Sequence, residues 1–425
     1  MKTKLLIVLL ILTVLVGLPL FAADPDPDLY KPSADNEYKL AGEVFVPTSV
    51  RILGMGGAGL GMKGYHDSFL FNPANLAGSG FKLSLPSVTV TAFNVQKILA
   101  SEGLDMIIDG DEDEKLGGAE KLIKEIKRNY SDVLTTDVST AFTLGGFGLS
   151  INAQERLMAF KDESWITTNL IAQVTAAATA GFGLNIPVVP KVLDIDLGVS
   201  VQAVYKAYLG ALTAGPLIDK LRNEEDPTAL FLNETPLVAG WALPVSVGAN
   251  FNFPFGLSLS AVARNINGNY TMTTYGSANQ WAKNILGNAL TEDAPKYSEI
   301  LEDGWTMESP WSLDFGFTWA PRFLGNILQP TIAIDVLDVM AMGGKQGDQL
   351  TYAFLEQTRL GASARLLSLL DVRYGLNQGY QSIGVGFDLL VFHIDAAYYT
   401  KNYGSGLDAQ ESLDALSLRF SIGSK

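Results

Sequence analysis

The sequence contains no cysteine and only two histidines in 425 residues. The absence of cysteine excludes disulfides, thiol catalysis and cysteine-ligated metals. His66 and His393 are far apart in the chain, and two histidines without further ligands make a poor metal site. The sequence therefore predicts no catalytic residues, no metal site and no cofactor, which is typical of a protein that is not an enzyme.

Charged residues are also scarce, and acidic residues outnumber basic ones. Charged residues make up 18% of the chain, and the formal net charge is −15. An acidic balance argues against binding nucleic acid, which requires a basic surface. Low charge together with 42 glycines and 10% aromatic residues is typical of a β-barrel whose outer face meets lipid.

Beyond its first residues the chain lacks an apolar run of about 18 residues, so no membrane-spanning helix is expected there. A basic start, an apolar run to Leu18 and small residues at Ala22 and Ala23 predict a cleaved signal peptide over residues 1–22. A retained anchor helix is the alternative, and a glycine and a proline near its end disfavour it. A polar segment, residues 23–41, follows.

What the sequence does contain is a long series of segments in which apolar and polar residues alternate, the pattern of β-strands. The clearest segment is Trp311–Trp319, which places Trp311, Phe315 and Trp319 on one face and Asp314 on the other. A soluble sandwich would bury the aromatic face, whereas a barrel would turn it to lipid. The two tryptophans are roughly 26 Å apart along a strand, close to the spacing of two aromatic girdles once the strand is tilted.

About fourteen such strands follow one another, an even number, as single-chain bacterial barrels require. Short and long connections alternate, with one tight exception near residues 377–379. We expect the long connections, above all residues 96–132, 210–237 and 272–309, to lie on the outer side of the membrane. The expected strands are 81–95, 133–144, 146–158, 165–184, 191–209, 238–253, 256–271, 310–320, 329–338, 356–366, 368–377, 380–389, 391–400 and 414–423.

Residues 51–76, RILGMGGAGLGMKGYHDSFLFNPANL, stand between the polar segment and the first strand. This glycine-rich run closed by Asn-Pro-Ala resembles the N-terminal plug, or hatch, of the FadL family of outer-membrane channels for long-chain fatty acids and other hydrophobic molecules. Residues 359–399 resemble the last strands of FadL-like proteins of spirochaetes and Bacteroidetes. A plain glycine-rich loop is the alternative. The residues that carry the plug motif are Gly54, Gly56, Gly57, Asn72, Pro73 and Ala74.

The resemblance implies an all-β fold: a transmembrane antiparallel β-barrel over residues 81–425, with residues 42–80 as a plug inside the lumen. It also implies helical outer loops that capture an apolar ligand, and the candidate residues there are Leu217, Trp281, Ile285 and Leu286. Arginines on the lumen face would either pair with neighbouring carboxylates or hold a ligand carboxylate. The arginines in question are Arg359, Arg365 and Arg373.

The favoured function is passive uptake of hydrophobic molecules, with long-chain fatty acids first, by a monomeric barrel in the outer membrane of a diderm bacterium. Its expected partners are those small molecules, outer-membrane lipid and the barrel-assembly machinery. Two alternatives stay open. One is a structural or secretion-associated barrel that binds proteins, and the other is a surface adhesin.

Overall fold

The structure is a computed structural model that describes residues 43–126, 129–161, 164, 166–209, 212–215, 232–233, 235–287, 298–322, 325, 327–403 and 412–424. The predicted signal peptide and polar segment lie outside these ranges. Among the helices described, none is long and apolar enough to cross a membrane.

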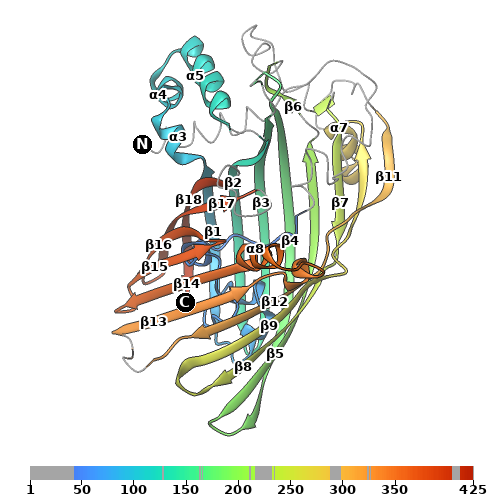
Figure 1. Ribbon diagram of the computed structural model, residues 1–425. Helices are drawn as coiled ribbons and strands as arrows, with labels where there is room; N and C mark the ends of the chain where they lie inside the picture. Colours follow the sequence, from blue (N-terminus) through green and yellow to red (C-terminus); the bar gives the residue numbers. More distant parts are fainter. Residues whose placement is uncertain are drawn as a thin grey trace.

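The strands form one antiparallel sheet that closes on itself, because β1 pairs with both β2 and β18 (Figure 1). Closure pairs the first strand with the last, so the sheet has no terminal strand among the residues that the structure describes. The strands are β1 Lys82–Phe93, β2 Asn129–Leu144, β3 Phe147–Lys161, β4 Asn169–Val189, β5 Leu193–Leu209, β6 Leu212–Thr213, β7 Leu237–Ala242, β8 Val245–Phe253, β9 Leu257–Ile266, β10 Tyr270–Tyr275, β11 Ile300–Met307, β12 Ser312–Trp319, β13 Leu328–Val336, β14 Thr358–Leu366, β15 Leu370–Asn377, β16 Tyr380–Leu389, β17 Phe392–Asn402 and β18 Ser412–Ser424.

Three pairs of these segments, β7 with β8, β9 with β10, and β11 with β12, each continue one barrel strand across a short interruption. The two-residue β6 pairs only with β4. The barrel therefore has fourteen strands, and the predicted fold class is confirmed.

The interruptions lie on neighbouring strands. Pro244 separates β7 from β8 and has no N–H to donate to a ladder. Asn265 adopts a left-handed backbone conformation with φ 59°, and its Nδ2 donates to the carbonyl oxygen of Ser309 across 2.8 Å. Side-chain hydrogen bonds thus hold the wall together where the backbone ladder is broken.

The two faces of the wall differ as the alternation predicts. On the strand that contains β12, Trp311 and Phe315 are 48% and 47% exposed and point outward, whereas Asp314 is 1% exposed and points into the lumen. Large apolar side chains are exposed on the outer face all round the barrel, including Leu197, Val199, Val247, Ile332, Val372 and Phe420. An apolar outer face over a polar interior is the pattern of a barrel that spans an outer membrane.

The wall is much taller on one side than on the other. β4 has 21 residues and β5 has 17, whereas β13 has 9 and β15 has 8. The long connections all leave one rim, which we call the outer rim, and they carry α3 Val95–Ala100, α4 Glu102–Asp109, α5 Glu112–Glu125, α7 Ala278–Leu286 and α8 Asp348–Gln357. β10 and β11 extend the wall into residues 272–309, so the loop there is shorter than predicted.

Residues 43–80, here called the inner segment, lie inside the barrel. They contain the short helices α2 Val50–Gly54, η3 Ser68–Leu70 and η4 Pro73–Leu76. α2 lies against β15, β16 and β17, and η4 lies against β4, β5 and β8. The inner segment therefore touches opposite parts of the wall and fills the lumen between them.

Candidate functional site

The glycines of the predicted plug motif allow the inner segment to approach the wall at backbone distance. A Cβ on Gly54 would lie 2.9 Å from the Cα of Gly384, and one on Gly56 would lie 2.5 Å from the backbone nitrogen of Leu376. Gly56 and Gly57 also have φ values of 66° and 84°, a region that favours glycine. The barrel wall also has glycine where it meets the inner segment, because a Cβ on Gly375 would lie 2.2 Å from the carbonyl carbon of Met55.

Asn72, Pro73 and Ala74 form the second contact with the wall. The Asn72 side chain is fully buried; its Oδ1 accepts from the backbone N–H of Ala74, and its Nδ2 donates to the carbonyl oxygen of Leu60. Pro73 stands at the start of η4, where a missing N–H costs nothing. The motif thus caps its own turn and ties two parts of the inner segment together.

A cluster of charges holds the middle of the inner segment. Arg51 Nη2 lies 3.0 Å from Asp67 Oδ1, and Ser49 Oγ donates to Asp67 Oδ2 across 2.7 Å. Burial raises the pKa of Asp67, but Arg51, His66 and Arg419 outweigh it, so this pKa lies well below its ordinary value. Asp67 therefore stays ionised at neutral pH and keeps its partners in place.

A carboxylate of the wall also binds the inner segment through its backbone. Asp335 on β13 is fully buried, and its Oδ2 accepts from the backbone N–H groups of Gly59 and Leu60 at 2.6 and 2.9 Å. Lys63 forms an ion pair with Asp196 on β5. Contacts of this kind on several strands fix the inner segment as an obstruction in the lumen.

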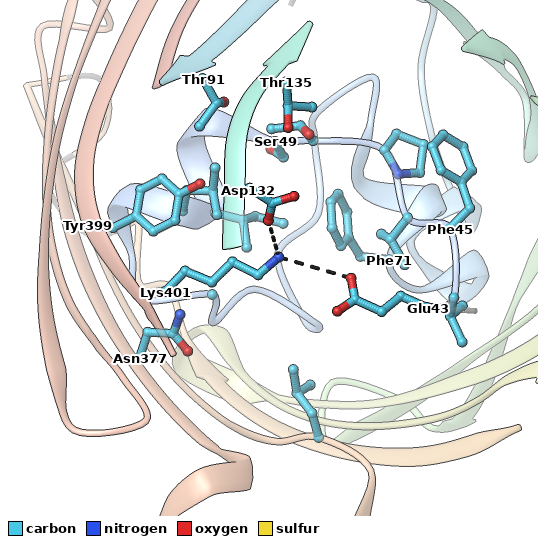
Figure 2. Close-up of a pocket in the computed structure, with 18 of the residues that line it drawn as sticks. Glu43, Phe45, Ser49, Phe71, Thr91, Asp132, Thr135, Asn377, Tyr399 and Lys401 are labelled. Atoms are coloured by element: carbon cyan, nitrogen blue, oxygen red, sulfur yellow. Dashed lines mark hydrogen bonds and ion pairs between the residues drawn. The ribbon is translucent and has the colours of Figure 1, made fainter. Parts of the chain in front are cut away.

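A cavity of about 440 Å³ lies between the inner segment and the outer rim. Ligand pockets usually measure about 300–1,000 Å³. Its lining combines apolar side chains with charged ones, and Figure 2 shows Lys401 between the carboxylates of Asp132 and Glu43. The lining includes Phe45, Phe71, Phe93, Tyr399, Arg156, Lys206, Lys401, Asp132 and Glu43.

The charged side of this cavity is an ion-pair network centred on Asp132. Asp132 accepts from Arg156 Nε at 2.5 Å, from Lys401 Nζ at 2.7 Å and from the hydroxyl of Tyr403 at 2.8 Å. Glu43 of the inner segment joins it, because its Oε2 lies 3.0 Å from Arg156 Nη1. Burial would raise the pKa of Glu43, but Lys401 and Arg156 lower it on balance.

Lys206 adds a third basic side chain to this side of the cavity. Its Nζ donates to the backbone carbonyl of Glu43 across 3.0 Å and lies 4.6 Å from the centre of the Tyr270 ring. Lys206 is 1% exposed. Three basic side chains, Arg156, Lys206 and Lys401, therefore face two carboxylates here, and one of those carboxylates belongs to the inner segment.

Lumen-facing positions become apolar directly outward of this network. Arg156 on β3 pairs with Gln173 on β4, and Lys206 lies nearby on β5. The next lumen-facing residue toward the outer rim is apolar or aromatic on each of these strands: Met158 on β3, Ile171 on β4 and Tyr208 on β5. These three belong to a buried cluster inside the barrel with Phe45, Ala177, Val204, Val238, Ala242, Tyr270, Met272 and Met307. The basic residues thus adjoin the apolar cluster on two sides: Met158, Ile171 and Tyr208 lie outward of them, whereas Ala177, Val204 and Ala242 lie one lumen-facing position inward of Lys206.

The predicted lumen arginines do not meet in one place. Arg373 is fully buried between Asp371 and Asp395, at 2.8 and 2.7 Å, and Arg365 lies 2.8 Å from Asp388. Only Arg359 lines the cavity, and its Nη1 donates to the carbonyl oxygens of Glu356 and Thr358.

Three of the predicted capture residues, all on α7, lie away from the lumen. Trp281 on α7 donates from Nε1 to the hydroxyl of Tyr205 across 2.8 Å. Tyr205 alternates with the lumen-facing Lys206, so it points outward, and α7 covers the outside of the wall. Ile285 and Leu286 on the same helix are 50% and 61% exposed. Leu217 lies outside the described residues.

No sequence pattern singled out the basic residues of this site, which are Arg156, Lys206 and Lys401. Each is a single basic residue within an otherwise ordinary strand pattern, and they are far apart in the sequence. Their one shared signal is position, since each stands near the outer end of its strand on the lumen face. Recognising the group required the register that links β17 to β3 and β5 around the barrel.

The two histidines lie near one another although they are distant in the sequence. His66 Nε2 accepts from Arg419 Nη2 across 2.7 Å, and His393 Nδ1 lies 2.9 Å from Asp388 Oδ1. Both line a void of about 10 Å³. Within the described ranges, no group of three or more histidine or acidic side chains is arranged to hold a metal.

Comparisons with known proteins give structural likeness only. No family model matches the chain, and no curated protein matches it. The fold is similar to that of FadL-type proteins. The toluene transporter TbuX of Ralstonia pickettii is 13% identical, with a TM-score of 0.46 over 89% of this chain and 98% of that one.

Two further solved structures show the same degree of likeness. The toluene transporter TodX of P. putida is 12% identical, with a TM-score of 0.44 over 90% of this chain and 99% of that one. A Pseudomonas aeruginosa FadL homologue is 12% identical, with a TM-score of 0.40 over 88% of this chain and 97% of that one. At these identities, residue roles do not pass from those proteins to this chain.

Proposed function

We propose that the barrel takes up hydrophobic molecules across the outer membrane by diffusion, and that long-chain fatty acids are its main substrates. The observation that carries the proposal is the junction inside the lumen, where Arg156, Lys206 and Lys401 adjoin the apolar cluster of Met158, Ile171 and Tyr208. A fatty acid has the same division into an anionic head and an apolar chain.

The proposed bound state places the carboxylate among the three basic side chains and the acyl chain among the apolar residues outward of them. In this structure the Glu43 carboxylate occupies part of the cationic region, where it binds Arg156. An incoming carboxylate would compete with Glu43 for the same donors. Because Glu43 begins the inner segment, its release would loosen the outer end of the obstruction.

The apolar part supplies the binding free energy. Transfer of a methylene group from water to an apolar environment is worth about 0.8 kcal/mol, so a chain of a dozen or more methylenes needs no energy coupling to enter. The cluster is closely packed, but three of its members are methionines, whose unbranched side chains repack readily. The inner segment then gates passage toward the periplasm.

Uptake of labelled oleate by cells, at matched surface expression, tests the proposal against a neutral hydrocarbon measured in parallel. Lys206→Met should reduce oleate uptake and leave the hydrocarbon unchanged, because a hydrogen bond to an ionised carboxylate contributes about 1.5–3 kcal/mol, roughly 10- to 100-fold. Lys97→Met, on the exposed side of α3, is the matched control and should change neither.

A second variant tests the apolar part. Replacing Met158 and Met272 by Ser should weaken uptake of long chains more than short ones, because the loss grows with the length of chain buried. Fatty acids should also co-purify with the wild-type protein in native mass spectrometry. Wild-type cells that take up neither oleate nor hydrocarbon above a deletion strain would overturn the transport proposal in favour of a structural or secretion-associated barrel.

A further inference from the structure

The surface that begins at Trp241 and continues over α7 differs from the rest of the outer rim. Trp241 is 53% exposed and points outward, because it pairs with Tyr205 while its neighbour Gly240 pairs with the lumen-facing Lys206. Below it on the same face lie Leu243 and Val247, 43% and 47% exposed. Trp241 is therefore the upper end of the apolar belt that meets lipid.

α7 begins where this belt ends. The outward side chains of Leu237, Ala239 and Tyr275 form a buried cluster with Ala278 of the helix, and Trp281 packs on its edge. The hydrogen bond from Trp281 to Tyr205 places Trp281 beside the residue that pairs with Trp241. Figure 1 shows α7 beside the upper parts of β7 and β11, on the tall side of the wall.

The second half of α7 is largely exposed and includes two large aliphatic side chains. Ile285 stands one turn after Trp281 on the same helix face, yet it is 50% exposed, and Leu286 is 61% exposed. Lys283 and Asn284 are exposed beside them, and the helix ends at Gly287 with φ 72°. The helix thus presents two large aliphatic side chains beyond the part that the wall covers.

We propose that α7 is an interfacial helix, with Ile285 and Leu286 among the acyl chains of the outer leaflet. Continuity with the lipid-facing belt through Trp241 is the argument for lipid over water or a protein partner. Tyrosine and tryptophan concentrate where a membrane surface begins, because each has an apolar ring and a polar edge. Lys283 has a long enough side chain to reach the headgroups. This inference does not depend on what the barrel transports.

The absence of cysteine allows a direct test by single-cysteine spin labelling in proteoliposomes. Ile285→Cys and Leu286→Cys are compared with Val199→Cys, on the lipid-facing belt, and with Leu99→Cys, 69% exposed on α3. Collision of each nitroxide with oxygen reports lipid, and collision with a water-soluble nickel chelate reports water. We expect positions 285 and 286 to resemble 199, with an oxygen-to-nickel ratio several-fold above that at 99.

Lipids that carry a quencher at a chosen depth give a second readout. A fluorescent label at 285 or 286 should be quenched more by a group near the headgroup than by one near the chain end, because α7 lies at the top of the belt. Nickel accessibility equal to that at position 99 would place the helix in water. Low accessibility to both reagents would place it against protein. Either result overturns the proposal, and all four substituted side chains are exposed, so folding is retained.

Discussion

Nδ2 of Asn72 donates a hydrogen bond to Oδ1 of Asn250 on β8 across 2.8 Å, and thereby ties the inner segment to the barrel wall. Asn250 in turn donates to Asn75 Oδ1 across 3.0 Å, and all three asparagines are buried. A buried amide that loses its partner keeps the full cost of its desolvation. This small network is therefore the point at which the inner segment is most easily weakened.

Replacement of both Asn72 and Pro73 by Ala should loosen the inner segment and raise permeability to small solutes. Each buried group left unpaired costs about 1–3 kcal/mol. Liposome swelling with small sugars measures the effect, and Asn284→Ala, at an exposed position on α7, is the control. Swelling rates equal to wild type in the double variant would show that the contact does not hold the segment.

Gly375→Ala should displace the inner segment from the opposite side of the barrel. The added Cβ would lie 2.2 Å from the carbonyl carbon of Met55, closer than any real Cβ contact, and backbone cannot yield as a flexible side chain can. Gly80→Ala, where a Cβ would meet open space, is the matched control. Single-channel conductance in planar bilayers should rise for the first variant and stay at the wild-type level for the second.

The Asp67 carboxylate makes the stability of the inner segment depend on pH in the acid range. Its folded-state pKa lies below the ordinary value of 3.8, so the stability it contributes is complete above that value and is lost as the pH falls below it. Protease protection of the inner segment should therefore be constant between about pH 7 and 5 and decline below about pH 4. Asp67→Asn should already lower protection at neutral pH. Equal protection of this variant and wild type would contradict the assignment.

Arg373→Met should destabilise the barrel without changing what it carries. Arg373 is fully buried between Asp371 and Asp395, and its removal leaves two carboxylates without their cation. Breaking a buried pair in this way costs about 3–5 kcal/mol. The midpoint of guanidinium unfolding in detergent, followed by heat-modifiable electrophoretic mobility, should fall, whereas the exposed control Arg322→Met should leave it unchanged. If Arg373→Met lowered the uptake of fatty acids without lowering stability, Arg373 would bind the ligand and the prediction would be wrong.

The number, order and facing of the strands could be predicted from the sequence because each depends on local pattern. Period-two alternation assigns Phe315 outward and Asp314 inward without knowledge of any neighbour. The tight connection at residues 377–379 was an exception to the alternation of loop lengths, and the structure retains it as the turn between β15 and β16.

The grouping of side chains across strands could not be predicted in the same way. Which residues meet at one height depends on the stagger of the barrel, and alternation does not encode it. Asp132 and Lys401 are 2.7 Å apart but 269 residues apart in the sequence. The position of α7 could not be predicted for a related reason. An amphipathic pattern shows that a helix has an apolar face, but it does not show which surface that face covers.

The unequal height of the wall has a consequence for the direction from which the cavity is reached. Strands of 8 residues, such as β15, span about 20 Å of membrane normal when tilted, whereas the 21 residues of β4 span roughly 50 Å. Asn377 and Gln378, at the low turn after β15, line the cavity. The outer opening of the barrel is therefore asymmetric. The strands on its high side extend above the bilayer, whereas on its low side the cavity opens sideways across the cell surface, level with the lipid headgroups.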